Sequence, residues 1–286
     1  MPRKRSMPAA VVVLVAPAAL LSLVVAASLA FGAPSATPAK VSTKAGLKKA
    51  KWAANVRITY GTTTVRYRSN GLPNHARQAQ YAVPTGPGVP SAANATAIAD
   101  PSKTQAYDFT IPTTPTRSAS VTPTGGGTIG VMISGASLFN PYEGDGVTVA
   151  VSGNFAVTDA SGEDVAFLDS CNGHPSPNGA YHYHALPTCI TATVDKANGA
   201  SHIIGIAFDG YPIYGDRSIN GKRVSKSKLD RCNGVTSPTP EFPKGIYHYV
   251  LLSTRDSTSS IRCFHGKVDP SLVAGRPLGM AGMMLG

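Results

Sequence analysis

Imidazole side chains are the groups of this 286-residue chain best suited to chemistry. His182 and His184 alternate with Tyr181 and Tyr183 in one tetrapeptide. In an extended strand, side chains two positions apart point to the same face, so the two imidazoles would lie side by side and the two phenol rings opposite them. Neutral imidazole is a good ligand for zinc, copper, nickel and iron. The tetrapeptide therefore predicts part of a transition-metal site.

An internal duplication adds a third imidazole. The segment Asp169-Ser170-Cys171-Asn172-Gly173, with Tyr181-His182-Tyr183 and Cys189 after it, recurs as Asp230-Arg231-Cys232-Asn233-Gly234, Tyr247-His248-Tyr249 and Cys263. The order is the same in both copies, about residues 169–189 and 230–263, so chance similarity is a poor explanation. If the copies pair, His248 joins His182 and His184, and three imidazoles leave one coordination position open for water or substrate.

Other side chains extend this metal hypothesis. His75 and His174 are the candidates for a fourth ligand, while Asp209, Tyr181 and Tyr183 are the candidates for polar groups that hydrogen-bond the ligands. Copper or zinc would suit imidazole best. An open position would let the metal activate water or oxygen, as in a hydrolase or an oxidase, but the sequence identifies no catalytic residue.

A second hypothesis needs no metal. A histidine in a strand is commonly a satisfied polar residue, and alternating Tyr and His also pack well across strands. On this hypothesis the protein is a non-catalytic module of the cell wall or extracellular space, in which Tyr and His line a groove for glycan or peptide. The tyrosines would then be core or pocket wall, because a buried Tyr supplies much apolar area.

The remaining motifs exclude several classes. Asp followed closely by Asn-Gly, as at Asp169 and Asp230, is typical of a turn, and the stretch 140–146 is a loop without the ligand pattern of an EF-hand. The sequence contains no Gly-x-Ser-x-Gly, phosphate loop, dinucleotide fingerprint or nucleic-acid-binding motif. A serine hydrolase, a nucleotide enzyme and a nucleic-acid-binding protein are therefore disfavoured.

The four cysteines predict two disulfides. An even number of cysteines in an exported chain indicates disulfides before a thiolate metal site. Three pairings are formally open, and the duplication favours pairing inside each copy, Cys171 with Cys189 and Cys232 with Cys263. Each closure would stabilise the fold by roughly 3 to 4 kcal/mol.

The N-terminal residues predict export. Arg3, Lys4 and Arg5 precede a long apolar run, which is typical of a signal peptide over residues 1–30 and is long enough to serve instead as an uncleaved anchor. Residues 31–52 are predicted to form a disordered basic linker. The whole chain has a net charge of +11, with cations concentrated between Lys40 and Arg77. A secreted protein with this basic stretch would associate with anionic cell-wall polymer or a membrane surface.

Residues 53–270 are predicted to form one all-β domain, a sandwich or open barrel of short strands with long loops, followed by a tail over 271–286. Alternating stretches such as 56–60 and 64–68 indicate half-exposed strands, and further short apolar runs are bounded by turn residues. The 29 Gly and 23 Pro residues fit many turns, and long helical periodicity is almost absent.

At these motifs the chain resembles the YHYH domain family of exported proteins. The resemblance covers about residues 56–266 and is based on Tyr181-His182-Tyr183-His184, Ser69-Asn70-Gly71-Leu72-Pro73-Asn74-His75, Ile129-Gly130-Val131 to Phe139-Asn140-Pro141, and Phe208-Asp209-Gly210-Tyr211-Pro212-Ile213-Tyr214-Gly215. It implies an exported, disulfide-bonded domain and no settled activity. It also supports His75 as a candidate ligand. The second copy departs from the family motif at Val250, which would make a site built from both copies asymmetric.

Overall fold

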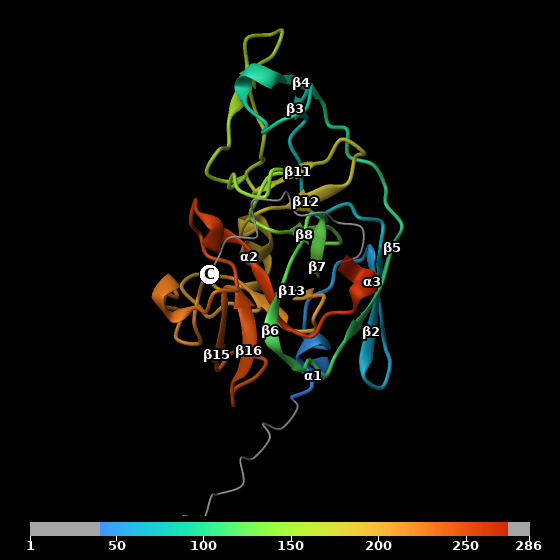
Figure 1. Ribbon diagram of the computed structural model, residues 1–286, viewed down its shortest axis with the longest axis vertical. Helices are drawn as coiled ribbons and strands as arrows, with labels where there is room; N and C mark the ends of the chain where they lie inside the picture. Colours follow the sequence, from blue (N-terminus) through green and yellow to red (C-terminus); the bar gives the residue numbers. More distant parts are fainter. Residues whose placement is uncertain (1–40, 274–286) are drawn as a thin grey trace, which may run out of the picture. The chain divides into compact units, whose positions relative to one another are not determined.

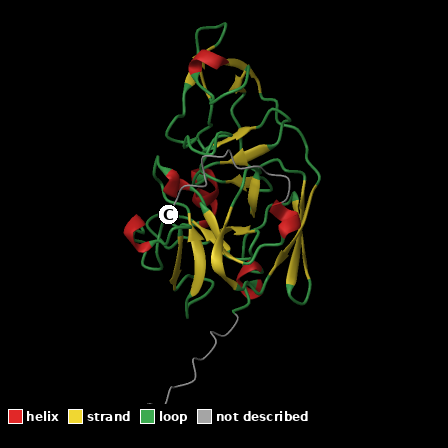
Figure 2. Ribbon diagram, viewed as in Figure 1, coloured by secondary structure: helices red, strands yellow, loops and turns green. Residues whose placement is uncertain are grey.

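The computed structural model of the protein describes residues 41–273 (Figure 1). Its strands are β1 (Val56–Tyr60), β2 (Thr64–Ser69), β3 (Gln80–Pro84), β4 (Ala95–Ala99), β5 (Tyr107–Pro112), β6 (Arg117–Pro123), β7 (Thr128–Met132), β8 (Ser137–Phe139), β9 (Ala156–Thr158), β10 (Asp164–Ala166), β11 (Gly173–Pro175), β12 (Tyr181–Tyr183), β13 (Ile203–Ala207), β14 (Pro212–Tyr214), β15 (Gly234–Ser237), β16 (Ile246–Val250) and β17 (Cys263–Gly266). The helices are α1 (Lys44–Leu47), α2 (Thr188–Val194) and α3 (Pro270–Val273), with single 3-10 turns at Ala92–Asn94, Lys226–Lys228 and Ser257–Ser259. The prediction of an all-β fold of short strands and long loops is confirmed (Figure 2).

Eight strands form the main sheet, in the order β11-β12-β8-β7-β13-β14-β16-β15. Each half contains two antiparallel hairpins, β7-β8 with β11-β12 and β13-β14 with β15-β16. In each half the second hairpin adds in parallel, β12 to β8 and β16 to β14. The halves meet where β7 pairs antiparallel with β13, so the sheet has an approximate two-fold axis between these two strands.

The duplication is therefore longer than the cysteine-containing segments suggest. The first hairpins correspond as well, with Ile129-Gly130 matching Ile204-Gly205 and Gly135 matching Gly210. At the centre of the sheet, a Cβ on Gly130 would lie 2.8 Å from the carbonyl oxygen of Ile206, and one on Gly205 would lie 2.6 Å from that of Val131. Glycine is required at both positions because each copy's backbone approaches the other this closely.

The central strands are buried on both faces. Every residue of β7, β12, β13 and β14 is buried, whereas β1 alternates between half-buried and exposed positions, as its sequence predicts. The three-stranded sheet β1-β2-β5 packs on the main sheet, and the hydroxyl of Tyr67 on β2 donates to the carbonyl of Met132 on β7 at 3.1 Å. Strands that are buried on both faces show no alternation of polar and apolar residues, so the sequence does not indicate which of their side chains share a face.

Both predicted disulfides are present, and the part of the chain that the structure describes has no free cysteine. Cys171 and Cys232 each lie in the Asp-x-Cys-Asn-Gly turn. In the first copy the Asp169 carboxylate accepts from the backbone N–H of Cys171 at 2.9 Å and of Gly173 at 3.1 Å. Asp230 makes the same bonds in the second copy. The prediction of turn chemistry for these two carboxylates is therefore correct.

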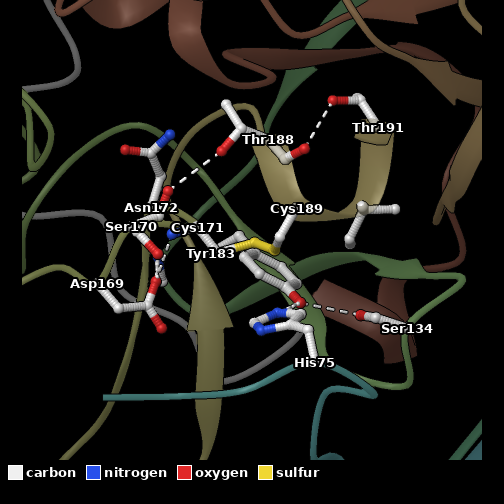
Figure 3. The surroundings of a disulfide bond; sticks show 12 residues. His75, Ser134, Asp169, Ser170, Cys171, Asn172, Tyr183, Thr188, Cys189 and Thr191 are labelled. Atoms are coloured by element: carbon white, nitrogen blue, oxygen red, sulfur yellow. Dashed lines mark hydrogen bonds between the residues drawn. A yellow bond between two sulfur atoms is a disulfide. The ribbon is translucent and has the colours of Figure 1, made fainter. Parts of the chain in front are cut away.

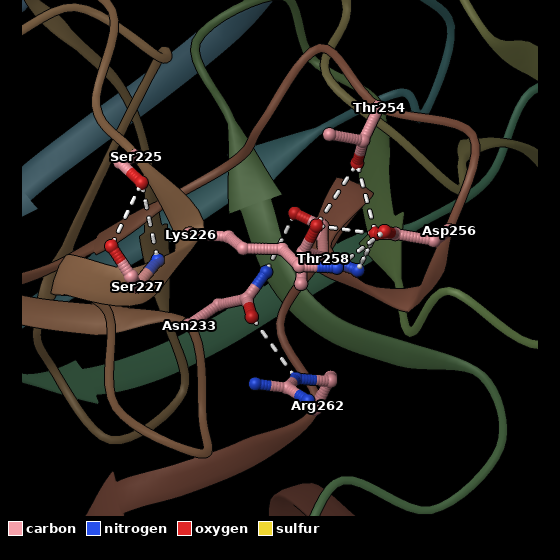
Figure 4. A network of polar contacts seen from close by, with 8 residues as sticks. All are labelled: Ser225, Lys226, Ser227, Asn233, Thr254, Asp256, Thr258 and Arg262. Atoms are coloured by element: carbon pink, nitrogen blue, oxygen red, sulfur yellow. Dashed lines mark hydrogen bonds and ion pairs between the residues drawn. The ribbon is translucent and has the colours of Figure 1, made fainter.

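The second turn is held by a further polar network (Figure 4). Asn233, which has φ 71°, donates through Nδ2 to the carbonyls of Thr258 and Ser260. Its Oδ1 accepts from Nε of Arg262 at 3.0 Å, and Thr258 is in turn bonded to the Asp256 carboxylate. This network fixes the segment that leads to Cys263, so the second copy is stabilised by side chains as well as by its disulfide.

The linker prediction needs correction at its C-terminal end. Residues 43–52 are ordered against the domain: Leu47 is fully buried, the Thr43 N–H donates to the Thr113 carbonyl at 2.8 Å, and Trp52 packs on Tyr67. The sequence did not indicate this order because the segment is rich in lysine. The short helix α1 buries only Gly46 and Leu47 and leaves the neighbouring lysines in or near solvent.

The predicted signal peptide, residues 31–40 and most of the predicted C-terminal tail lie outside the described residues. Within residues 41–273, no helix has both the length and the apolar character needed to cross a membrane.

Truncation of Leu47 tests the order of this N-terminal segment. We expect Leu47→Ala to lower the free energy of unfolding by about 2 to 5 kcal/mol, because a large side chain is removed from the core. Val41→Ala, at an exposed position a few residues earlier, is the control and should have almost no effect. Urea denaturation of both variants measures this, and equal stability of the two would contradict the packing described here.

Candidate metal centre

Three imidazoles meet at one end of the main sheet. His174 on β11 pairs directly with His182 on β12, and His184 follows β12 immediately. Their ligand nitrogens all lie within 4.8 Å of one another, and all three side chains are buried. His174 and His182 face each other across the hairpin, and His184 lies on the same side as His182 because it follows two residues later in an extended chain.

Backbone carbonyls determine which ring nitrogens of His182 and His184 face the centre. Nδ1 of His182 lies 3.0 Å from the carbonyl oxygen of Ala180, and Nδ1 of His184 lies 2.8 Å from that of Asn140. A carbonyl only accepts, so both Nδ1 atoms hold the proton in the neutral rings and both Nε2 atoms present a lone pair. This arrangement is typical of histidines that bind a metal through Nε2.

The Nε2 atoms converge as ligands of one ion would. Those of His182 and His184 lie 3.0 Å apart, and Nε2 of His174 is buried without a hydrogen-bond partner. Two nitrogens each about 2.1 Å from one zinc ion would be roughly 3.0 to 3.4 Å apart. A cation among these atoms would satisfy the two lone pairs of His182 and His184 that otherwise face each other, and a ring nitrogen of His174 lies within 4.8 Å of both ligand atoms.

Burial keeps the imidazoles neutral. It lowers the pKa of His174 and His182 well below the ordinary value, and the neighbouring imidazoles lower both further. Burial also lowers the pKa of His184 to about 4, against a partial opposing effect of its bond to the Asn140 carbonyl. Unprotonated rings at neutral pH are the form that coordinates a metal.

Aromatic side chains hold the rings in place. Phe139 on β8 stacks on His182 with ring centroids 3.8 Å apart, and Phe167 packs on His174 at 4.3 Å. The three imidazoles open onto a cavity of about 380 Å³. Its wall also includes Pro84, Gly86, Gly88, Pro90, Gly126, Gly127, Tyr142, Glu143, Pro175, Ser176 and Pro177.

The family model described as YHYH protein matches residues 108–223 and 219–266. The chain belongs to the YHYH family. The matched segments together include every strand of the main sheet, both copies of the duplication and all three histidines of the centre. No curated protein and no solved structure matches the chain.

The YHYH motif of the first copy does not meet that of the second. β12 and β16 are separated by four strands of the main sheet, or about 24 Å at the usual strand spacing, and they are well apart in Figure 1. The expectation that His248 joins His182 and His184 is therefore wrong. The two-fold axis places the second hairpins at opposite ends of the sheet, and His248 packs on Tyr214 instead.

His75 also lies outside the cluster. Its Nε2 is 2.7 Å from the hydroxyl of Tyr183, and that hydroxyl is 3.0 Å from Oγ of Ser134, beside the Cys171–Cys189 disulfide (Figure 3). It belongs to the opposite face of β12, because the tyrosines and histidines of the motif alternate. His75 lies within 4.8 Å of both cysteine sulfurs, but the disulfide leaves these sulfurs without a thiolate.

The polar groups suggested as ligand partners have other roles. Tyr181 donates to the Asp169 carboxylate at 2.6 Å, and Asp209 accepts from the hydroxyl of Tyr249 at 2.6 Å and from the N–H of Gly266 at 2.9 Å. Tyr181 and Tyr183 are fully buried core residues on the face opposite the imidazoles. The hydrogen-bond partners of His182 and His184 are the carbonyls of Ala180 and Asn140, which sequence reasoning missed because any residue type offers a carbonyl.

Only the first copy of the duplication has the triad. His248 donates through Nδ1 to the Ile246 carbonyl at 3.0 Å, just as His182 donates to the Ala180 carbonyl. The partner of His248 across the hairpin is Val235, however, and the residue two positions later is Val250. Valines thus occupy the positions of His174 and His184, and His248 is a natural control for His182.

The neutral triad predicts a pH-dependent stability of the metal-free protein. Unfolded imidazoles titrate near pH 6.5, while in the fold their pKa values are lowered, so below pH 6.5 the unfolded state binds more protons. The free energy of unfolding should fall as the pH decreases from 6.5 toward 4, by roughly 1.4 kcal/mol per pH unit for each imidazole kept neutral.

His184→Asn removes one of these groups, so its stability should fall less steeply over the same range. Urea denaturation of chelator-treated protein at several pH values gives both slopes. An identical pH dependence in the variant and the unsubstituted protein would show that His184 is not held neutral by the fold.

Proposed function

We propose that this YHYH protein is exported and binds one divalent transition-metal ion through Nε2 of His174, His182 and His184. The observation that supports this best is the 3.0 Å separation of two Nε2 atoms whose rings both have Nδ1 directed to a backbone carbonyl. A ring nitrogen of His174 lies within 4.8 Å of their ligand atoms, and its buried Nε2 has no hydrogen-bond partner, which is a second indication.

The donor set supports copper or zinc as the ion. All three donors in this group are imidazole nitrogens, which suit these borderline metals, whereas magnesium and calcium prefer oxygen. Three protein ligands would leave a coordination position toward the cavity, as catalytic zinc sites do. A small molecule in the cavity would then contact the metal directly.

Export and surface association remain part of the proposal. The basic and apolar pattern of residues 1–30 and two disulfides support an oxidising, extracellular destination. Exposed cations at Lys48, Lys49, Lys51 and Arg57 would hold the domain near an anionic polymer or membrane surface.

The alternative, a groove for glycan or peptide lined by Tyr and His of the motif, has less support. Tyr181, Tyr183 and Tyr249 are fully buried and their hydroxyls are bonded to protein groups, so they offer no surface to a ligand. The cavity wall of Phe139, Tyr142 and Phe167 could still bind a ligand without a metal.

Metal content tests the proposal directly. The mature protein, secreted in metal-replete medium and purified without a histidine tag, should hold about one zinc or copper ion per chain by elemental analysis. His182→Ala should lose most of it, because two remaining imidazoles form a weak site. His248→Ala, at the matching position of the second copy, should keep it.

The control variant makes the outcome specific. Equal metal loss in both variants would indicate nonspecific binding or unfolding, which circular dichroism separates. Folded protein without metal in all three samples would rule out the metal-binding proposal and leave the ligand-binding cavity as the better account.

A further inference from the structure

Glu143 is the only acidic residue among those that line the cavity of the triad. It is half-buried and lies in the loop between β8 and β9. Two backbone hydrogen bonds of Glu143 close the loop: its N–H donates to the Thr148 carbonyl at 2.8 Å, and its carbonyl accepts from the Gly146 N–H at 2.9 Å. Glu143 therefore has a defined backbone position at the cavity wall.

Asn140 connects this loop to the metal centre. Its carbonyl is the partner of His184 Nδ1, its Oδ1 accepts from the Tyr142 N–H at 2.9 Å, and its Nδ2 donates to the Gly125 carbonyl at 2.6 Å. One buried residue thus fixes the start of the Glu143 loop, through its backbone carbonyl relative to His184 and through its side chain relative to the glycine-rich wall of the cavity. At the far side of the loop, Asp145 accepts three bonds, from the N–H groups of Val147 and Thr148 and from the Thr148 hydroxyl.

Glu143 lines the same cavity as the triad. It is not in the group of side chains whose ligand atoms lie within 4.8 Å of one another. A carboxylate on the wall of the cavity but outside the ligand set can contact a water molecule or a substrate that enters the cavity. Metal-activated water in hydrolases is commonly paired with a carboxylate in this way.

The environment also suits proton transfer. Burial, with a smaller contribution from the charge of Asp145, raises the pKa of Glu143 to about 7. A carboxyl group with such a pKa can accept a proton and return it near neutral pH.

We propose, building on the metal site above, that Glu143 is the general base of a hydrolytic centre for uncharged carboxylic esters or amides. A metal ion held by the triad would polarise a water molecule in the cavity, and Glu143 would accept one proton from that water. The water oxygen would attack the substrate carbonyl carbon, the bond to the leaving oxygen or nitrogen would break, and Glu143 would return the proton to that leaving atom. The products are a carboxylic acid and an alcohol or amine.

The cavity wall indicates an uncharged substrate. It contains no Lys or Arg, so nothing on the described wall besides the metal would neutralise a phosphate, sulfate or carboxylate group. The remaining lining is mostly Pro, Gly and aromatic, which offers apolar surface and accessible backbone groups to an acyl chain or a peptide.

The experiment compares zinc-loaded protein with Glu143→Gln and with Glu163→Gln, which changes an exposed glutamate outside the cavity. The probes are p-nitrophenyl acetate and p-nitrophenyl phosphate, and zinc is measured in each sample. We expect zinc-dependent hydrolysis of the acetate alone, a loss of about 100-fold or more in kcat/KM for Glu143→Gln with zinc retained, and no change for Glu163→Gln.

Each other outcome is decisive. Loss of zinc from folded Glu143→Gln would make Glu143 a ligand, and an unchanged rate with zinc retained would exclude it as the base. Zinc-loaded protein that does not exceed the metal-free protein on the acetate would overturn the hydrolytic proposal and leave the metal site standing. Preference for the phosphate would overturn the substrate class, and absence of zinc from all samples would overturn the metal site itself.

Discussion

The antiparallel pairing of β7 with β13 is the contact on which the rest of the molecule depends. It joins two copies of the same double hairpin into one sheet. It requires glycine at Gly130 and Gly205 because a carbonyl oxygen of the other copy lies within 2.8 Å of where each Cβ would be. The pairing puts the most apolar strands at the centre, where both faces are covered. It also sends the two histidine-containing hairpins to opposite ends, so each can have a different environment.

This separation explains how one copy can hold a candidate metal centre while the other is structural. In the first copy, carbonyl partners direct two Nε2 atoms inward and a third imidazole faces them across the hairpin. In the second copy, valines at the same positions leave His248 as a single buried imidazole beside Tyr214. The turn, the disulfide and the buried tyrosine are common to both copies, which indicates a role in folding, whereas two of the three histidines of the candidate site occur in the first copy alone.

Local patterns in the sequence predicted the features that are determined by residues close together along the chain. The half-exposed strands at 56–60 and 64–68 follow from alternation along the chain, and the Asp-x-Cys-Asn-Gly turns and the disulfide pairing follow from spacing and from repetition of one motif. His174 was predicted only as a possible fourth ligand, because its pairing with His182 depends on a hairpin register that spacing leaves open. The position of His248 could not be predicted, because a duplication does not say whether its copies lie face to face or at opposite ends of a sheet.

The hairpins 128–139 and 203–214 were not recognised as copies, because buried apolar residues replace one another freely and little beyond the glycines is kept. The sequence predicted only that Glu143 lies in a loop, because the cavity that it lines is formed by segments far apart along the chain.

The Cys171–Cys189 disulfide has a consequence for how the centre would assemble. His174, His182 and His184 all lie between these two cysteines, so the three donors belong to one covalent ring of the chain. Their effective concentration toward one another is therefore high before the rest of the domain has folded. An ion bound at the proposed site would be chelated by this ring. Oxidation of the two cysteines would then precede metal capture in the maturation of the protein.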